Sequence, residues 1–196
     1  ITTSAVLHAG AGAVCLVWTA LVLATGRGPA ARLLAAACGI AAFWAGSTGL
    51  ALMSHSLWPS HLAAAAEIGR WLVWLAVLLF LYHRIAGERA GPLVRLFALA
   101  AGLSAVTALV ARFAPPGIIQ IMDAFGPIGL LARLALALMV VLMAENLFRT
   151  ANERERWHVS LPAIALGGLA AFDVLLYADA ALSRGLSQPL VDARAA

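Results

Sequence analysis

The chain has 196 residues, of which 63% are hydrophobic and 11% charged, and its formal net charge is +4. A soluble domain of this length needs far more polar surface, so the composition excludes that class. The 13 basic residues are all arginine and stand mostly in short connectors, without a consecutive basic block. This distribution indicates membrane topology rather than nucleic-acid binding, and we expect no nucleic-acid partner.

Six apolar runs follow one another along the chain. Each has about 20 residues, which is enough for a helix to cross a hydrocarbon layer of roughly 30 Å. The sequence therefore predicts an all-α fold, a polytopic bundle of six transmembrane helices that forms a single domain over residues 1–196. The predicted helices span residues 5–25, 33–54, 62–83, 93–111, 126–146 and 159–182.

The breaks between these runs contain residues that commonly end helices. The first run has no basic segment before it and no convincing cleavage site, so it is predicted to remain as a helix. Cys15 and Cys38 lie inside apolar runs and are interpreted as small hydrophobic side chains rather than a disulfide. The predicted breaks are Gly26–Pro29, Trp58–Pro59, Gly91–Pro92, Pro115–Gly117 and the charged segment Arg149–Trp157.

The orientation in the membrane follows from the arginines of the short connectors. Cytoplasmic loops carry an excess of basic residues. The second and fourth connectors contain only Arg112, so the odd connectors are predicted to be cytoplasmic and the N-terminus to lie outside. Six crossings also place the end of the chain outside, so a cytoplasmic effector domain would require further crossings. The arginines of the odd connectors and their flanks are Arg27, Arg32, Arg84, Arg89, Arg95, Arg149, Arg154 and Arg156.

Five ionisable residues interrupt the apolar runs, where each is costly unless it is paired or hydrated. Glu67 and Arg70 belong to the third run, Arg133 to the fifth, and Asp173 and Asp179 to the sixth. At 1.5 Å per residue, all five lie about 5–14 Å from the outer face. We therefore expect one charged layer in the outer half of the bilayer, shared by three helices.

The spacing of these residues predicts three contacts. Glu67 and Arg70 are three residues apart and can pair on one helix face, and Asp173 shares a face with Tyr177. Arg133 has no acidic neighbour on its own helix, and Asp173 is its best partner by depth. Two interpretations stay open: a salt-bridge network that fixes packing, or a polar cavity that opens outward and binds a ligand or passes protons.

The remaining polar and aromatic residues indicate no chemistry of their own. Trp44 and Trp71 are interpreted as core packing, with lining of the polar layer as the alternative, and the five histidines, His8 among them, as solvated residues near helix ends or in loops. No metal-ligand spacing, phosphate-binding loop or nucleophile motif occurs. The sequence therefore predicts no metal, no cofactor and no catalytic residue in this chain.

Three segments carry a resemblance to a known family. They are Glu145-Asn146-Leu147-Phe148-Arg149, then Glu155-Arg156-Trp157, then the segment from Phe172 through Asp173, Tyr177 and Asp179 to Ala180. Together they resemble the membrane half of PrsK-type sensor histidine kinases of the PEP-CTERM/exosortase system. The family's E-N-L-Y-R-like motif has phenylalanine here at Phe148, and its tyrosine before the first aspartate is Phe172.

The resemblance implies a sensory input domain of a two-component system, located in a bacterial inner membrane. It implies a homodimer, an envelope ligand and a full-length protein that is a histidine kinase, although this chain lacks the kinase domains and would itself transfer no phosphoryl group. Two other functions stay open from the residues: a small proton-coupled transporter that uses Asp173 and Arg133, or a structural subunit of a membrane complex.

Overall fold

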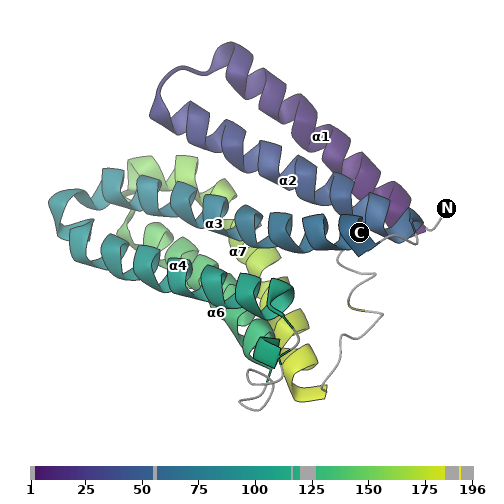
Figure 1. The fold of residues 1–196 in the computed structure, drawn as a ribbon. Helices are drawn as coiled ribbons and strands as arrows, with labels where there is room; N and C mark the ends of the chain where they lie inside the picture. Colours follow the sequence, from purple (N-terminus) through teal and green to yellow (C-terminus); the bar gives the residue numbers. More distant parts are fainter. Residues whose placement is uncertain (1–2, 55–56, 116, 120–126, 184–189, 191–196) are drawn as a thin grey trace. The chain divides into compact units, whose positions relative to one another are not determined.

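The computed structural model describes residues 3–54, 57–115, 117–119, 127–183 and 190, and the side chains of residues 154–158 lie outside that description. Because these residues contain helices and no strand, the predicted all-α fold is confirmed. Figure 1 shows the helices of the chain. They are α1 (Thr3–Thr25), α2 (Pro29–Met53), α3 (Leu57–Ala86), the 3-10 helix η1 (Gly87–Ala90), α4 (Gly91–Phe113), α6 (Ile128–Thr150) and α7 (Glu153–Ser183).

Within this part of the chain, 5 helical stretches are long and apolar enough to cross a membrane. One of them, residues 57–113, contains both α3 and α4, which η1 joins. The chain reverses its direction at η1 (Figure 1), and Gly87 there has φ 64°, a conformation that glycine adopts without steric cost. The stretch thus comprises two of the helices predicted from the sequence.

Three helices begin earlier than predicted because a proline stands near their start. Pro29 is the first residue of α2, Pro92 is the second residue of α4, and Pro59 lies in the first turn of α3. The first N–H groups of a helix have no partner within the helix, so proline loses nothing there. The Trp58–Pro59 and Gly91–Pro92 pairs therefore start helices, whereas the sequence predicted them as breaks.

The predicted charged connector at residues 149–157 is also mostly helical. α6 continues to Thr150, and α7 begins at Glu153 instead of residue 159. With 31 residues, α7 is about 46 Å long and exceeds the roughly 30 Å hydrocarbon layer. Its charged first turns can therefore extend into the headgroup region without any break in the helix.

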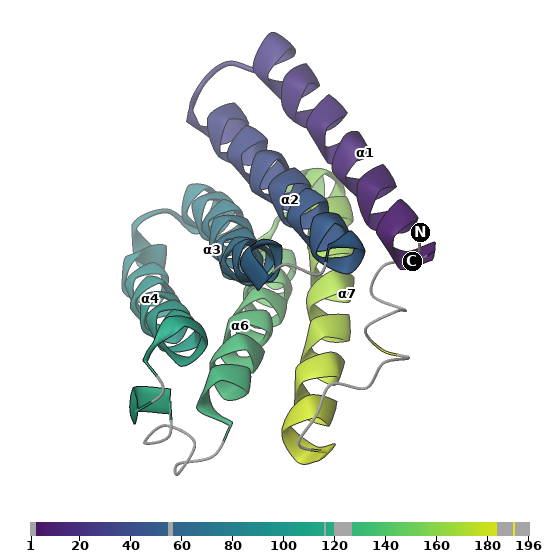
Figure 2. The ribbon, with the colours of Figure 1, turned by 45° about the vertical axis from the view of Figure 1, so that its right-hand side comes forward.

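The contacts divide the chain into two compact units, and α3 contributes to both of them. In the first unit, which extends to Val73, α1 and α2 pack against each other along their lengths (Figures 1 and 2). Small residues permit this approach: a Cβ added to Gly12 would lie 3.5 Å from the Ala42 carbonyl oxygen and from Cβ of Ala45.

The second unit, residues 74–187, has α6 in contact with both α4 and α7 (Figure 2). One face of α6 is buried by large apolar side chains at helical spacing, among them Leu136, Val140, Met143 and Leu147. The α4 side of this packing is made of small residues: Ala101, Ala105 and Ala108 are buried. The prediction of a single domain over residues 1–196 is not tested by this division.

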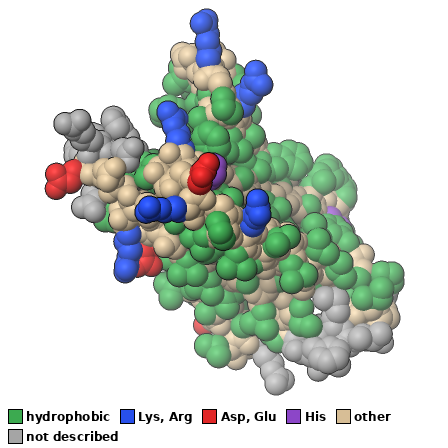
Figure 3. All heavy atoms as spheres, turned by 90° about the vertical axis from the view of Figure 1, so that its left-hand side faces the viewer, with side chains coloured by type: hydrophobic (Ala, Val, Ile, Leu, Met, Phe, Trp, Pro, Cys, Tyr) green, Lys and Arg blue, Asp and Glu red, His purple; other side chains and the backbone are tan. Residues whose placement is uncertain are grey.

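The outer surface of the helices is apolar. Hydrophobic side chains cover most of the face drawn in Figure 3, and large residues such as Leu99, Leu103 and Leu161 are 75%, 70% and 72% exposed. Surfaces of this kind are unfavourable in water but favourable against lipid chains. Together with the length of the helices, they make the chain a membrane protein.

Candidate functional site

A cluster of buried polar and aromatic side chains lies inside the first unit. The guanidinium carbon of Arg70 is 4.1 Å from the ring centroid of Trp44 and 4.4 Å from that of Trp71. Arg70 is only 7% exposed and Trp71 only 2%. A cation held against indole faces and shielded from solvent gains substantially from the ring quadrupole. The packing of Arg70 against two tryptophans therefore compensates part of the cost of burying its charge.

His8 joins this cluster from α1. Its ring lies 5.5 Å from that of Trp44 with an interplanar angle of 61°, an edge-to-face contact. Nδ1 is 2.8 Å from the Ser4 carbonyl oxygen, which can only accept a hydrogen bond, so Nδ1 is the protonated nitrogen. In the neutral ring Nε2 is then an acceptor. His8 is buried, contrary to the prediction that it would be solvated.

Glu67 and Arg70 lie on the buried face of α3 together with Trp71, at spacings of three and four residues. Since α3 begins at Leu57, Arg70 stands about 20 Å along the helix, further than a helix beginning at residue 62 would place it. Glu67, Arg70 and Trp44 all have interaction partners in the structure. The specific Glu67–Arg70 ion pair stays a prediction.

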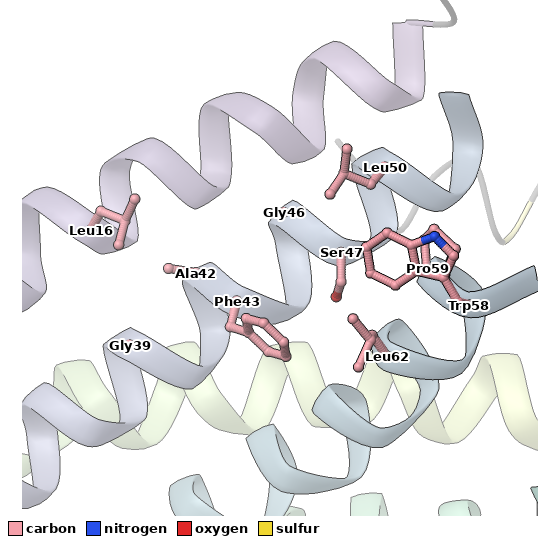
Figure 4. Close-up of a pocket in the computed structure, with 10 residues that line it drawn as sticks. All are labelled: Leu16, Gly39, Ala42, Phe43, Gly46, Ser47, Leu50, Trp58, Pro59 and Leu62. Atoms are coloured by element: carbon pink, nitrogen blue, oxygen red, sulfur yellow. The ribbon is translucent and has the colours of Figure 1, made fainter. Parts of the chain in front are cut away.

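The hydroxyl groups of α2 near Trp44 are satisfied locally. Ser47 and Thr48 both donate to the Trp44 carbonyl oxygen, over 3.0 and 2.8 Å. Ser47 is buried, and its side chain also borders a cavity of about 440 Å³ within the first unit (Figure 4). The other walls are apolar, so the cavity suits an apolar group rather than a charged one. They are Leu16, Gly39, Ala42, Phe43, Gly46, Leu50, Trp58, Pro59 and Leu62.

The second unit contains the remaining predicted polar residues. Asp173 is 2% exposed and Tyr177 1%, and they lie one turn apart on the buried face of α7 that also contains Ala170 and Ala180. Asp179 is half-buried. Both Asp173 and Tyr177 have interaction partners in the structure. Their burial shows that this face of α7 is not simply apolar packing.

Arg133 lies near the start of α6 and is half-buried. It borders a small cavity together with Arg112 from the last turn of α4, a residue that the sequence had suggested only as a topology signal. The predicted pairing of Arg133 with Asp173 is not tested. Because Glu67 and Arg70 belong to one unit and the other polar residues to the second, the single layer shared by three helices also stays a prediction.

In the family-like motif at the end of α6, Glu145 and Arg149 are exposed, Asn146 is half-buried and Leu147 is buried. Arg149 and Glu145 form an ion pair of 2.6 Å, one helical turn apart, with side chains 75% and 49% exposed. Nδ2 of Asn146 donates to the Leu142 carbonyl oxygen over 2.9 Å. The side chains of Arg156 and Trp157 lie outside the described residues. Exposed polar residues at a helix end are available to a partner or a following domain.

Among the described residues, no group of three or more histidine, cysteine or acidic side chains could hold a metal ion. Cys15 and Cys38 are free thiols. Among the cluster residues, His8 was predicted to be solvated, and Trp44 and Trp71 were predicted mainly as core packing. Their periodicity within one helix could not reveal a contact that depends on how α1, α2 and α3 are aligned.

Comparison with known proteins found no relative: no family model, curated protein or solved structure matches the chain. The fold and the burial pattern nevertheless define its class, a polytopic α-helical membrane protein with polar side chains buried inside its membrane-spanning helices.

Proposed function

We propose that this chain is the membrane-embedded input domain of a two-component sensor histidine kinase in a bacterial inner membrane. The observation that carries the proposal is the cluster in which buried His8, Arg70 and Trp71 surround the half-buried Trp44. A charge buried within a membrane-spanning helix is costly and marks a functional site by default. The family-like motif around Glu145 adds independent support from the sequence.

The cluster joins side chains of three helices, and one of them provides a path for a signal. α3 is continuous from Leu57 to Ala86 and ends beside the arginine-containing turn η1. An envelope ligand that changes the packing of Arg70 against Trp44 would shift α3 relative to α1 and α2. Such a shift needs two arrangements of similar energy, which a cation between two aromatic faces can provide.

The proposal requires that the gene encode a cytoplasmic kinase domain, and that the full-length protein act as a homodimer. The direct test is autophosphorylation of the full-length protein in vesicles with ATP. We expect Arg70→Met and Trp44→Leu to change the basal rate severalfold, whereas Arg95→Gln, at an exposed position of α4, leaves it unchanged. The absence of a kinase domain from the reading frame would eliminate the proposal.

A second candidate, a proton-coupled transporter, is favoured by one observation. Asp173 is buried one turn from buried Tyr177 in an apolar helix, as carboxyl groups of proton relays are. If this function holds, proteoliposomes would show proton-dependent uptake that Asp173→Asn abolishes and Asp179→Asn retains. Uptake in the absence of any kinase domain would replace the sensor proposal.

A further inference from the structure

The cavity of about 440 Å³ in the first unit is a groove that opens on its surface. One side is a face of α2 and the other is formed by the first turns of α3, so we call it the α2–α3 groove. Several of its lining side chains are about half exposed, among them Phe43, Leu50 and Trp58. The groove is therefore open to the surroundings of the protein and is not enclosed in the core.

The hollow exists because α2 has small residues on this face. Gly39, Ala42 and Gly46 follow one another at a spacing of three or four residues, so they lie along one side of the helix. A Cβ added to Gly46 would meet no atom within 4 Å. Figure 4 shows larger side chains, such as those of Phe43 and Leu62, around this space. The groove thus has a smooth floor between bulky rims.

The length of the groove corresponds to one leaflet of a bilayer. The residues from Gly39 to Leu50 cover about 16 Å along the helix axis. α2 runs from Pro29 to Met53, so Gly39 stands near its middle and Leu50 near its end. Half of the roughly 30 Å hydrocarbon layer is about 15 Å. The groove therefore extends from the depth of the bilayer centre to one interface, as a single acyl chain does.

The walls of the groove are suited to hydrocarbon. None of the described residues that line it is charged. The Ser47 hydroxyl already donates to the Trp44 carbonyl oxygen over 3.0 Å, so it requires no polar partner from an occupant. Apolar spaces stay dry, and an unfilled space loses van der Waals contacts along its lining. In a bilayer, hydrocarbon fills such a groove better than water does.

The two ends of the groove differ in a way that orients an occupant. Trp58 lines the end formed by the first turn of α3, and tryptophan is typical of the membrane–water interface. The opposite end, at Gly39, lies near the middle of α2. A lipid in the groove would accordingly have its headgroup near Trp58 and the terminal methyl group of its chain near Gly39.

We propose that the α2–α3 groove binds one acyl chain of a membrane phospholipid from the leaflet in which Trp58 lies. In the orientation predicted from the arginines, this is the outer leaflet. The proposal does not depend on the sensor function, because it concerns only the shape and chemistry of the groove.

The test is photo-crosslinking of the protein in phosphatidylcholine vesicles that contain a small amount of a diazirine-labelled analogue. One analogue carries the diazirine near the ester group of the acyl chain and the other near its terminal methyl group. Mass spectrometry then maps the adducts. We expect the first label on Leu50 and Trp58 and the second on Leu16 and Ala42. The proposal is overturned if these residues are labelled no more than exposed apolar residues elsewhere, such as Leu99.

The variant that fills the groove is Gly46→Leu. The position accepts a Cβ, and leucine favours a helix more than glycine does. The matched control is Gly10→Leu on α1 of the same unit, where an added Cβ also meets no atom within 4 Å and which is not among the residues that line the groove. Gly46→Leu should remove most of the groove adducts, and Gly10→Leu should retain them.

The map of wild-type adducts decides the question even where Gly46→Leu fails to fold. Two outcomes with the variants would also overturn the proposal. One is labelling of folded Gly46→Leu at the wild-type level. The other is a wild-type dimer that Gly46→Leu dissociates, which would assign the groove to a second copy of the chain.

Discussion

The contact between Arg70 and Trp44 can be tested as an energetic interaction in its own right. Arg70 is 7% exposed and its guanidinium carbon lies 4.1 Å from the indole centroid. For a desolvated pair of this kind, a cation–π interaction contributes about 2 kcal/mol. Removing it should change the unfolding equilibrium constant about 30-fold. The perturbations are Arg70→Met and Trp44→Leu, which preserve much of the apolar volume.

The assay is a double-mutant cycle, because each single substitution also removes other contacts of these residues. The two single variants and the double variant are unfolded reversibly by increasing the fraction of SDS in mixed micelles. The free energies of unfolding are then combined, which cancels the contacts that each residue makes elsewhere. We expect a coupling energy of about 2 kcal/mol between positions 44 and 70.

The chain offers a matched control pair. The guanidinium carbon of Arg112 lies 5.9 Å from the ring centroid of Phe113, and Phe113 is 48% exposed. Distance and solvation therefore both weaken the cation–π interaction of this pair. The cycle of Arg112→Met and Phe113→Leu should give a coupling of about 0.5 kcal/mol or less. If the Arg70–Trp44 coupling is no larger than this control, the indole face does not stabilise the buried charge and our reasoning about the cluster fails.

Three further predictions concern single substitutions. Gly129→Ala should destabilise the protein by about 1–3 kcal/mol, because the added Cβ would clash with Ala111 of α4. Gly102→Ala is the control and should be neutral or stabilising, since no atom lies within 4 Å of the added Cβ. Equal SDS midpoints for the two variants would contradict the close approach of α4 and α6. Asp173→Asn should lower the thermal stability in detergent more than Asp179→Asn, because only the first carboxyl is buried, and the reverse order would show that burial does not decide the cost. Glu145→Gln should change the unfolding free energy by only about 0.5 kcal/mol, since its ion pair with Arg149 is exposed, and a loss of several kcal/mol in the same SDS titration would contradict this.

The helices could be predicted from the sequence because the lipid environment restricts the composition of a membrane-crossing segment. Every membrane-crossing segment must be long, apolar and hydrogen-bonded internally. Helix starts were harder to predict, since the same proline that breaks a helix in its interior is favoured in its first turn. Pro59 and Pro92 stand in such first turns, and the charged residues after Asn152 continue into α7.

The sequence also singled out ionisable residues that the structure buries: Glu67, Arg70 and Asp173. The free-energy cost of burying a charged side chain depends on the residue and on the apolar segment that surrounds it in the sequence, so it can be judged without knowledge of the fold. The interaction partners of these three residues cannot be predicted in this way. The contacts of Arg70 with Trp44 and of Trp44 with His8 each join two helices, and the shared cavity of Arg112 and Arg133 depends on the α4–α6 contact.

The two units differ in what makes their packing specific. Lipid chains are as apolar as leucine, so burying apolar area contributes little to helix association in a membrane. The interlocking side chains of α6 include Leu136, Val140 and Met143, which provide shape complementarity in the second unit. The α1–α2 contact instead consists largely of alanine and glycine, which allow close approach but fix alignment weakly. In the first unit, the directional contacts of Arg70, Trp44 and His8 must therefore supply much of the alignment. A ligand or substitution at that cluster should consequently shift these helices before it unfolds them, and this is the behaviour that a sensory input domain needs.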